Sequence, residues 1–460
     1  MKAVVIGGGI AGLAAARRLE SLLPEFEIDL VERSQRLGGK LLTEHMHGFL
    51  VEGGADSFLS RKERGVGLCE ELGLAGELVG RRPESARSYV RHGSELHLLP
   101  EGLTGMIPTD LDSLADSTLL SQVGRERLAA EVDLPPVPTG ADESIASFVT
   151  RRLGAEAYER LVEPLMTGIY GGDGEQLSLQ ATFPNLRALE LEHGSLIRGL
   201  LAQSPEAVAT RPPFVTLASG LETLVARVAE GLRHTRVVTG RAALGVRRSD
   251  HGYEVTLDAG ERVHSDGVVL CVPAFAAAEL LADLDSDLAA AHAEIPYAST
   301  AVVSLAYRDG DVVHPLDGYG YVVPRAEGSE MLACTWTSSK WEGRAPDGFV
   351  LIRVYAGRFG GRDVVEDSDG ELVGLARDEL RLLGIEAEPH LSRIDRWPLG
   401  MPQYVLGHPE RLKRIESALA DHPGLALAGA AYRGVGIPDC IHSGEEAARS
   451  LTESLARVPG

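Results

Sequence analysis

The chain is poor in cysteine, with only four cysteines, Cys69, Cys271, Cys334 and Cys440, in 460 residues. No two of them stand close enough to form a CxxC metal or redox motif, and the spacing does not support a disulfide framework. We therefore expect buried free thiols in a reducing compartment, which favours a cytoplasmic protein.

Long apolar runs and an excess of basic residues are also absent. No uncharged apolar run reaches the roughly 18 residues that span a bilayer. The 67 acidic residues outnumber the 45 basic ones, which gives a net charge of −22. Such a surface repels nucleic acid and anionic lipid, so neither is expected as a general partner. The chain is 44% hydrophobic and long enough for two or three domains.

Glycine is concentrated near the start, where an uncharged stretch runs from Ala3 to Ala16 in KAVVIGGGIAGLAAARRLE. The stretch lacks a small-residue cleavage site, and we interpret it as a short buried strand, a glycine turn and a helix. The spacing Gly7-x-Gly9-x-x-Gly12 is typical of dinucleotide-binding proteins. Gly7 permits the tight turn, Gly9 lets the backbone approach a pyrophosphate, and Gly12 lets the helix pack on the strand. The helix N-terminus would then face the phosphates.

An acidic residue at the end of the next predicted strand supports this interpretation. The stretch FEIDLVE ends at Glu32, twenty residues after Gly12. A carboxylate there can accept hydrogen bonds from a ribose 2′-OH and would repel a 2′-phosphate, which argues against NADP. An NAD domain would continue into its next helix, whereas here the loop ERSQRLGGKL brings glycines and cations, and GFLVEGGADSFL follows as a strand and a second glycine turn, Gly53-Gly54.

This pattern resembles the superfamily of flavin-containing amine oxidases, phytoene desaturases and protoporphyrinogen oxidases, and the resemblance implies FAD. Three stretches are similar to the protoporphyrinogen oxidases, most of all to the Gram-positive branch whose members oxidise coproporphyrinogen III. They are GADSFLSRKERGVGLCEELGL (54–74), LVEPLMTGIYGGDGEQLSLQATFPNL (161–186) and RWPLGMPQYVLGHPERL (396–412). The C-terminal AYRGVGIPDCIHSG fits the same family. The resemblance covers essentially the whole chain and implies an oxygen-using oxidase of haem synthesis that converts coproporphyrinogen III, or protoporphyrinogen IX, to the porphyrin.

The order of patterns predicts an α/β fold with α+β elements in three parts. We expect a Rossmann-like FAD-binding domain from discontinuous segments, a mixed-sheet substrate-binding domain, and a helical insertion that covers the site. The predicted segments are 1–85, 205–275 and 401–460 for the first, 86–100 and 276–400 for the second, and 101–204 for the third.

Three local elements are predicted as well. A hairpin is expected about His92-Gly93, and a surface loop over residues 131–142. The C-terminal helix should begin near Gly434–Ile437. If its N-terminus points at the flavin, its dipole stabilises negative charge at the N1–C2=O edge and favours hydride acceptance.

Most residues of these glycine segments, together with a few neighbours, form the predicted cofactor site. The residues expected to contact FAD are Gly7, Gly9, Ile10, Ala11, Gly12, Glu32, Arg33, Gly39, Lys40, Gly53, Gly54, Ala55, Asp56, Val238, Gly429, Gly436 and Ile437.

Oxidation of a porphyrinogen needs a flat apolar slot over the flavin and cations for the propionates. The resemblance suggests Ile169, Tyr170, Phe275, Leu280 and Trp336 for the slot; plain core packing is the alternative, and the better one for Phe275 and Leu280. For the propionates we favour the cations Arg61, Lys62 and Arg64, with a solvated helix start paired to Glu63 as the alternative.

No residue is assigned as a catalytic acid or base, because aromatisation drives the reaction and ring N–H protons can leave to water. Asp439 and His442 could move protons, but the family reading needs no such base. No metal site is predicted either, because His45 and His47 form an HxH pair without a third ligand nearby.

Three rival functions stay open from the sequence. An amine oxidase would need two aromatic rings at the C-terminal flavin segment, where only Tyr432 and Tyr404 are available. A carotenoid-type desaturase would need an apolar membrane-facing helical patch, and LADSTLLSQVGRERLAAEVDL is too charged for that. A flavin-bearing or porphyrin-carrying scaffold without turnover is the third. The expected partners are the porphyrinogen and molecular oxygen, with a peripheral membrane contact and a transient ferrochelatase contact compatible with the family.

Overall fold

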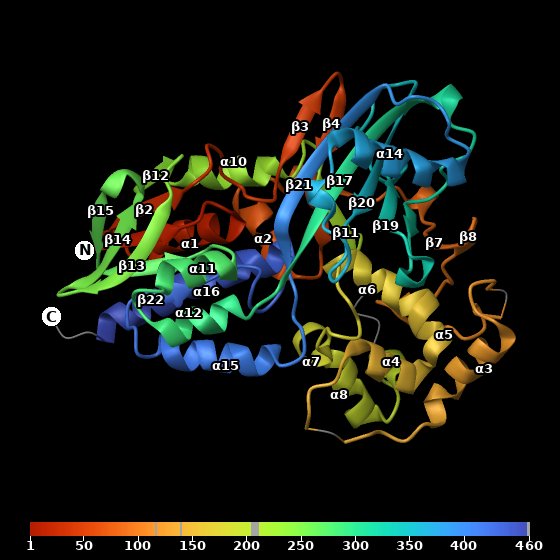
Figure 1. The fold of residues 1–460 in the computed structure, drawn as a ribbon, viewed down its shortest axis with the longest axis horizontal. Coiled ribbons are helices and arrows are strands. Elements are labelled where there is room, and N and C mark those ends of the chain that lie inside the picture. The colour runs from red at the N-terminus through yellow and green to blue at the C-terminus, as the bar shows by residue number, and fades with distance from the viewer. Residues whose placement is uncertain (116, 139, 204–210, 458–460) are drawn as a thin grey trace.

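The computed structural model describes residues 1–115, 117–138, 140–203 and 211–457, and it has three parts (Figure 1). A parallel sheet with helices lies near both termini, a larger sheet lies beside it, and a group of short helices packs below the larger sheet. The mixed α/β fold that the sequence predicted is confirmed. The residue limits assigned to each domain stay a prediction.

The parallel sheet collects five strands from distant parts of the chain. Their order across the sheet is β12-β2-β1-β16-β22, and all their pairings are parallel. The side chains of the central strand are buried on both faces, as its apolar run predicts. The strands are β1 (Lys2–Ile6), β2 (Glu27–Glu32), β12 (Thr235–Thr239), β16 (Gly267–Leu270) and β22 (Leu425–Leu427).

Two layers cover this sheet. Ala3 and Val5 face a core shared with four helices, α1 (Ile10–Leu22), α2 (Glu63–Glu71), α10 (Glu222–Gly231) and α16 (Ile437–Arg457). Val4 and Ile6 face the other layer. That layer consists of α11 (Ala274–Leu281), α12 (Ser286–Ala293), α15 (His408–Leu419) and an antiparallel sheet of β13 (Ala243–Ser249), β14 (Gly252–Leu257) and β15 (Arg262–Ser265). The C-terminal helix thus begins where the sequence predicted.

The second large sheet has seven strands in the order β21-β17-β20-β19-β18-β7-β8. Helix α14 (Asp369–Leu380) packs its apolar residues against the sheet core. The predicted hairpin about His92-Gly93 is confirmed, because β7 and β8 pair on either side of it. The strands are β21 (Leu391–Pro402), β17 (Tyr297–Arg308), β20 (Phe349–Ala356), β19 (Met331–Trp336), β18 (Gly320–Val322), β7 (Tyr89–His92) and β8 (Glu95–Leu98), and α13 (Thr337–Lys340) follows β19.

Smaller sheets connect the two large ones. Strand β11 (Phe214–Leu217) pairs with β5 (Phe58–Leu59) on one side and β6 (Leu78–Gly80) on the other. A hairpin of β3 (Thr43–Met46) and β4 (Phe49–Glu52) packs its apolar residues against β17 and β20. A two-stranded unit of β9 (Leu103–Thr104) and β10 (Ile107–Pro108) precedes the helical part.

The helical part has its own hydrophobic core. Its elements are α3 (Gln122–Ala129), α4 (Ile145–Leu153), α5 (Ala155–Ala157), α6 (Glu163–Tyr170), α7 (Leu179–Thr182), α8 (Pro184–His193) and α9 (Leu196–Ala202). The prediction that residues 131–142 form a surface loop is wrong for Glu131, the first of them. Glu131 is fully buried and its Oε1 accepts a 2.9 Å hydrogen bond from Nε of Arg152. Over the described ranges, no helix combines the length and apolarity needed to cross a bilayer.

The contact between α1 and α16 depends on a glycine, which gives a first prediction. A Cβ added to Gly444 would lie 2.1 Å from the carbonyl oxygen of Ala11. We expect Gly444→Ala to lower the free energy of unfolding by about 1–3 kcal/mol, because backbone atoms cannot rotate away. Gly374→Ala in α14 is the matched control, since its added Cβ would meet no atom within 4 Å. The control should be stabilised by up to about 1 kcal/mol. Equal denaturant midpoints for the two variants would contradict this packing.

Candidate functional site

The turn after β1 leaves space in front of α1. Gly7 has a φ of +108°, and a Cβ on Gly12 would lie 1.8 Å from the Gly7 carbonyl oxygen. Gly9 directly precedes α1, and a Cβ there would meet no atom within 4 Å. The turn therefore forms an open cradle at a helix N-terminus, whose first residues are Ile10 and Ala11. Free backbone N–H groups at such a place bind phosphate.

Glu32 is held beside this cradle. One carboxylate oxygen accepts a 2.7 Å hydrogen bond from the N–H of Gly8, and the other accepts a 2.8 Å bond from the N–H of Ser34. Val238 on β12 is in register with the residue before Glu32, so it lies at the same end of the sheet. Arg33 is exposed. The carboxylate is thus positioned at the carboxyl end of β2, where a dinucleotide's ribose binds in this type of sheet.

The loop after Glu32 returns to the cradle. The N–H of Gly38 donates a 2.8 Å bond to the carbonyl oxygen of Gly8, and a Cβ on Gly39 would lie 3.5 Å from Cα of Gly9. Lys40 then extends toward β21, where its Nζ donates to the carbonyl oxygen of Gly400. Its side chain is accessible to solvent, yet surrounding protein desolvates the ammonium and lowers its pKa. Both facts place Lys40 beside an internal space that solvent can reach.

The second glycine turn borders the same space. A Cβ on Gly54 would lie 2.1 Å from the carbonyl oxygen of Lys40. A side chain at Gly54 would therefore displace the loop that follows Glu32. Nε1 of Trp397 donates a 2.8 Å bond to the carbonyl oxygen of Gly53, and Arg353 donates a 2.6 Å bond to that of Gly54. These bonds hold the turn, and Ala55 is exposed on it.

Asp56 ends this turn inside a group of cations. Its carboxylate accepts a 2.9 Å hydrogen bond from Nζ of Lys340 and a 3.2 Å bond from Nε1 of Trp341, and Arg353 lies 3.8 Å away. Although burial opposes ionisation, Lys340 and Arg353 hold the pKa of Asp56 well below its usual range. Asp56 therefore anchors the turn as an ion, whatever else it contacts.

The C-terminal segment brings a second helix N-terminus to this region. Gly429 has a φ of +120°, and its N–H donates a 3.0 Å bond to Oγ of Ser443 on α16. The N–H of Gly436, just before Ile437 begins α16, donates a 3.2 Å bond to Oδ2 of Asp439. The charge of Lys40 acts on Cys440 in the first turn of α16, which places that turn near the internal space.

These segments fit a dinucleotide cofactor such as FAD. The open cradle at Gly9 suits a pyrophosphate, and Glu32 suits a ribose. Lys40 and the turns about Gly54 and Gly436 border the adjoining space, as a long cofactor requires. The residues predicted for FAD from three distant parts of the chain thus lie around one region, although their individual contacts stay predictions.

The predicted slot residues divide into two groups. Ile169 on α6 is 46% exposed, and Tyr170 beside it packs against the rings of Phe183 and Tyr404. Phe275 is half-buried and contacts the ring of Tyr297. Ile169 and Phe275 stay candidates for contact with a substrate, whereas Tyr170 is only 6% exposed and belongs to the core of the helical part.

Two slot predictions require correction. Trp336 has no exposed surface and packs in the core of the seven-stranded sheet, against the rings of Tyr89 and His314. Leu280 is buried on α11 in the core beneath the parallel sheet. Both side chains are surrounded by protein, so core packing, the alternative reading, describes them.

The predicted propionate cations also have different surroundings. Arg61 is exposed, and Nζ of Lys62 lies 2.6 Å from a carboxylate oxygen of Asp439 in the first turn of α16. Arg64 donates 2.7 Å and 2.8 Å hydrogen bonds to Glu445 and Glu71. Its charge is therefore already compensated, and we do not keep Arg64 as a propionate ligand.

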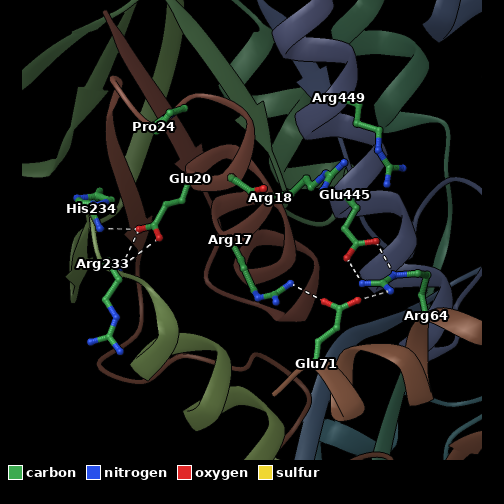
Figure 2. A pocket seen from close by; sticks show the side chains of 11 residues that line it. Arg17, Arg18, Glu20, Pro24, Arg64, Glu71, Arg233, His234, Glu445 and Arg449 are labelled. Carbon is green, nitrogen blue, oxygen red and sulfur yellow. Dashed lines mark hydrogen bonds and ion pairs between the residues drawn. The ribbon is translucent and has the colours of Figure 1, made fainter. Parts of the chain in front are cut away.

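Arg64 in fact lines a pocket of about 600 Å³ on the outside of the parallel-sheet part (Figure 2). The pocket lies between the last turns of α1, helix α2 and the middle of α16, away from the cradle before α1. Figure 2 shows Glu71 joining Arg17 to Arg64, and Glu445 joining α16 to Arg64. The arrangement ties three helices together by ion pairs.

Several functional-site neighbours were missed from the sequence. Trp397 lies in the stretch RWPLGMPQY, which carried the family resemblance, but no spacing rule connects it to Gly53. Lys340 and Arg353 reach Asp56 across 284 and 297 positions of sequence. No local pattern marks either residue, because Lys340 follows the end of β19 by four residues and Arg353 lies in the middle of β20.

Comparison with known proteins agrees with this geometry. The model of the family described as flavin containing amine oxidoreductase matches residues 10–452. A coproporphyrinogen III oxidase of Bacillus subtilis is 38% identical, with 96% of each chain covered. The chloroplastic protoporphyrinogen oxidase 1 of Spinacia oleracea is 30% identical, covering 99% of this chain and 84% of the relative. A crystal structure of a "putative protoporphyrinogen oxidase" from Exiguobacterium sp. has a TM-score of 0.88 and 33% identity, with 98% of each chain covered.

The family match spans nearly the whole chain, and the open cradle before α1 with the carboxylate of Glu32 beside it fits a dinucleotide cofactor. The chain therefore belongs to the flavin-containing amine oxidoreductase family and is an FAD-dependent oxidoreductase.

Proposed function

We propose that this enzyme oxidises a porphyrinogen to the aromatic porphyrin in haem biosynthesis, with coproporphyrinogen III as the preferred substrate and protoporphyrinogen IX as the alternative. The observation that carries the proposal is the match at 38% identity over 96% of both chains to a protein named coproporphyrinogen III oxidase. Two more relatives of that name, from Staphylococcus and Propionibacterium, match over 92% or more of each chain.

The chain's own residues would bind and orient the reactants. Backbone N–H groups at the start of α1 bind the pyrophosphate, and Glu32 accepts from the ribose. The N-terminus of α16 would stabilise negative charge that develops on the flavin. FAD, when bound, supplies hydride acceptance at N5.

The substrate needs few polar groups. Ile169 and Phe275 offer apolar surface to the macrocycle, and Lys62 offers a charge to a propionate. Because a lysine ammonium has three donors, Lys62 can keep its bond to Asp439 while binding a carboxylate. Ring N–H protons leave to water, so no general base is required.

The structure supplies reasons against the rivals. In an amine oxidase, Tyr404 and Tyr432 would have to present open ring faces, but they are only 1% and 9% exposed. Tyr404 is also stacked on His408, with its hydroxyl bonded to the backbone of Ala430 and Gly434. A carotenoid-type desaturase needs an apolar helical patch, which the exposed charges of Glu126 and Asp133 oppose.

The proposal also includes the electron acceptor and two further interaction partners. We propose molecular oxygen as the electron acceptor, so that each two-electron oxidation yields one hydrogen peroxide and three of them yield the porphyrin. A peripheral membrane contact through the helical part, and a transient contact with a ferrochelatase that takes the product, complete the proposal.

Purified yellow protein given coproporphyrinogen III and protoporphyrinogen IX in parallel tests this function. We expect porphyrin fluorescence that depends on oxygen and develops faster with coproporphyrinogen III. Absence of fluorescence from both substrates, in protein that carries its flavin, would refute it.

The two neighbouring cations make a paired prediction. Lys62→Gln should raise the KM for coproporphyrinogen III by about tenfold, the value of one hydrogen bond to a charged group. Arg64→Gln should leave KM and kcat near wild type, because its partners are Glu71 and Glu445. Steady-state porphyrin fluorescence measures both. If Arg64→Gln raised the KM as much as Lys62→Gln does, Arg64 would have to be counted as a propionate ligand after all.

A further inference from the structure

Arg81 is a cation whose charge no carboxylate compensates at close range. It follows β6, and its guanidinium carbon lies 4.8 Å from the ring centroid of Phe214 and 4.3 Å from that of Tyr319. Contact with two aromatic faces fixes the plane of a guanidinium and leaves its N–H edges available. Among the residues whose side chains the structure describes, no carboxylate forms an ion pair with Arg81, in contrast to most arginines of this acidic chain.

The cations near the Asp56 turn are already engaged. Lys340 is bonded to Asp56, and Arg353 to the carbonyl oxygen of Gly54. Arg344 donates to the backbone oxygens of Leu217 and Ala218. Arg81 is half-buried, and desolvation lowers its pKa while the charge of Asp56 raises it. A half-buried cation without a carboxylate partner is costly unless a ligand supplies the opposite charge.

The position of Arg81 connects it to the candidate site. Gly80 pairs with Val215 on β11, and Phe214 on the same strand pairs with Leu59 on β5. Strand β5 runs between the Asp56 turn and Lys62, so one small sheet joins these three places. The N–H of Arg82 donates a 3.1 Å bond to the carbonyl oxygen of Lys340, which fixes Arg81 beside the cations of the Asp56 turn.

Phe214 adds an apolar surface at this point. It is a large apolar side chain that is 36% exposed, directly beneath the guanidinium. Tyr319 is held by its hydroxyl, which donates a 2.9 Å bond to the carbonyl oxygen of Arg82. A cation with free N–H edges next to an exposed aromatic ring suits a ligand that carries a carboxylate on an apolar body.

We propose that Arg81 binds a propionate of the porphyrinogen, as a second carboxylate anchor besides Lys62. This inference rests on the proposed function. The fork of Arg81 takes the two carboxylate oxygens in parallel hydrogen bonds, and Phe214 and Tyr319 hold the fork in place. No covalent step is involved.

The test compares ligands with and without carboxylates, in holoenzyme. Coproporphyrin III and its tetramethyl ester are titrated against wild type and Arg81→Gln, and binding is followed by porphyrin absorbance. For Arg81→Gln we expect the preference for the acid over the ester to fall by about tenfold or more, with the ester's affinity unchanged. Arg87→Gln is the matched control. Arg87 lies six residues after Arg81, is more exposed than Arg81, and already pairs with Asp317. Its acid-to-ester preference should equal that of wild type.

Arg81→Lys keeps the experiment decisive if the glutamine variant fails to retain flavin. The lysine keeps the charge but loses the two parallel N–H donors of the guanidinium. The acid-to-ester preference of Arg81→Lys should therefore lie between those of wild type and Arg81→Gln. A wild-type preference in the folded variants overturns the inference. Turnover of coproporphyrinogen III by wild type, measured in the same preparation, separates this outcome from failure of the proposed function.

Discussion

Gly12→Val protein is expected to purify without its yellow colour. The added Cβ would lie 1.8 Å from the carbonyl oxygen of Gly7 and 3.3 Å from Cβ of Cys271. The clashing atom is the backbone oxygen of Gly7, which lies in a turn with a positive φ. This oxygen cannot move away from the new side chain without opening the cradle. We expect a cost above about 3 kcal/mol in the flavin-binding conformation. The ratio of flavin to protein absorbance measures the result.

The matched control is Gly245→Val on β13, where an added Cβ would meet no atom within 4 Å. Valine favours strands, so this variant should keep its flavin and its stability. Full flavin content in Gly12→Val would show that the cradle before α1 is not the cofactor site.

Asp56→Asn is expected to destabilise the protein by about 3–5 kcal/mol, the usual result of removing one partner of a buried ion pair. The substitution leaves Lys340 without its carboxylate and Arg353 without a nearby negative charge. The second glycine turn also loses an anchor, so flavin content should fall with stability. Denaturant unfolding of the holoprotein and the flavin absorbance measure the two effects.

The same ion pairs predict how stability depends on pH. The pKa of Asp56 is depressed in the folded protein, so the folded state favours the carboxylate over the acid. Its contribution is complete above the ordinary aspartate pKa of about 4 and is lost as pH falls below it. Between neutral pH and pH 3, wild type should therefore lose more stability than Asp56→Asn does.

Asp317→Asn is the control for a carboxylate near the surface. Its partner Arg87 is exposed, and exposed pairs contribute little. The unfolding midpoint should stay near that of wild type. An Asp56→Asn midpoint as close to wild type as this control would contradict the structural role given to Asp56.

The cofactor half of the site could be predicted because its signals are local. Gly7, Gly9 and Gly12 lie within six residues, and Glu32 ends the next strand, so a spacing rule finds them. The start of α16 was found in the same way, from glycines just before an amphipathic pattern. Turn geometry is determined by neighbouring residues, so short patterns are informative about it.

The rest depends on contacts between distant residues. Arg64 was expected at a propionate, but Glu445 lies 381 positions away and pairs with it in the folded chain. Trp336 looked like a site aromatic, but β18, β19 and β7 enclose it in a core. Arg81 carried no motif, and the two rings over which it lies come from strands and loops far from it in the sequence. Such pairings are decided by the tertiary fold.

Anaerobic mixing of the yellow holoprotein with coproporphyrinogen III tests the central claim most directly. The account predicts loss of the oxidised flavin absorbance within one turnover, followed, when air is admitted, by return of the yellow colour and formation of coproporphyrin III. A flavin that stays oxidised with the porphyrinogen, but is bleached by an amine or a polyene, would contradict it and leave only the FAD-binding fold.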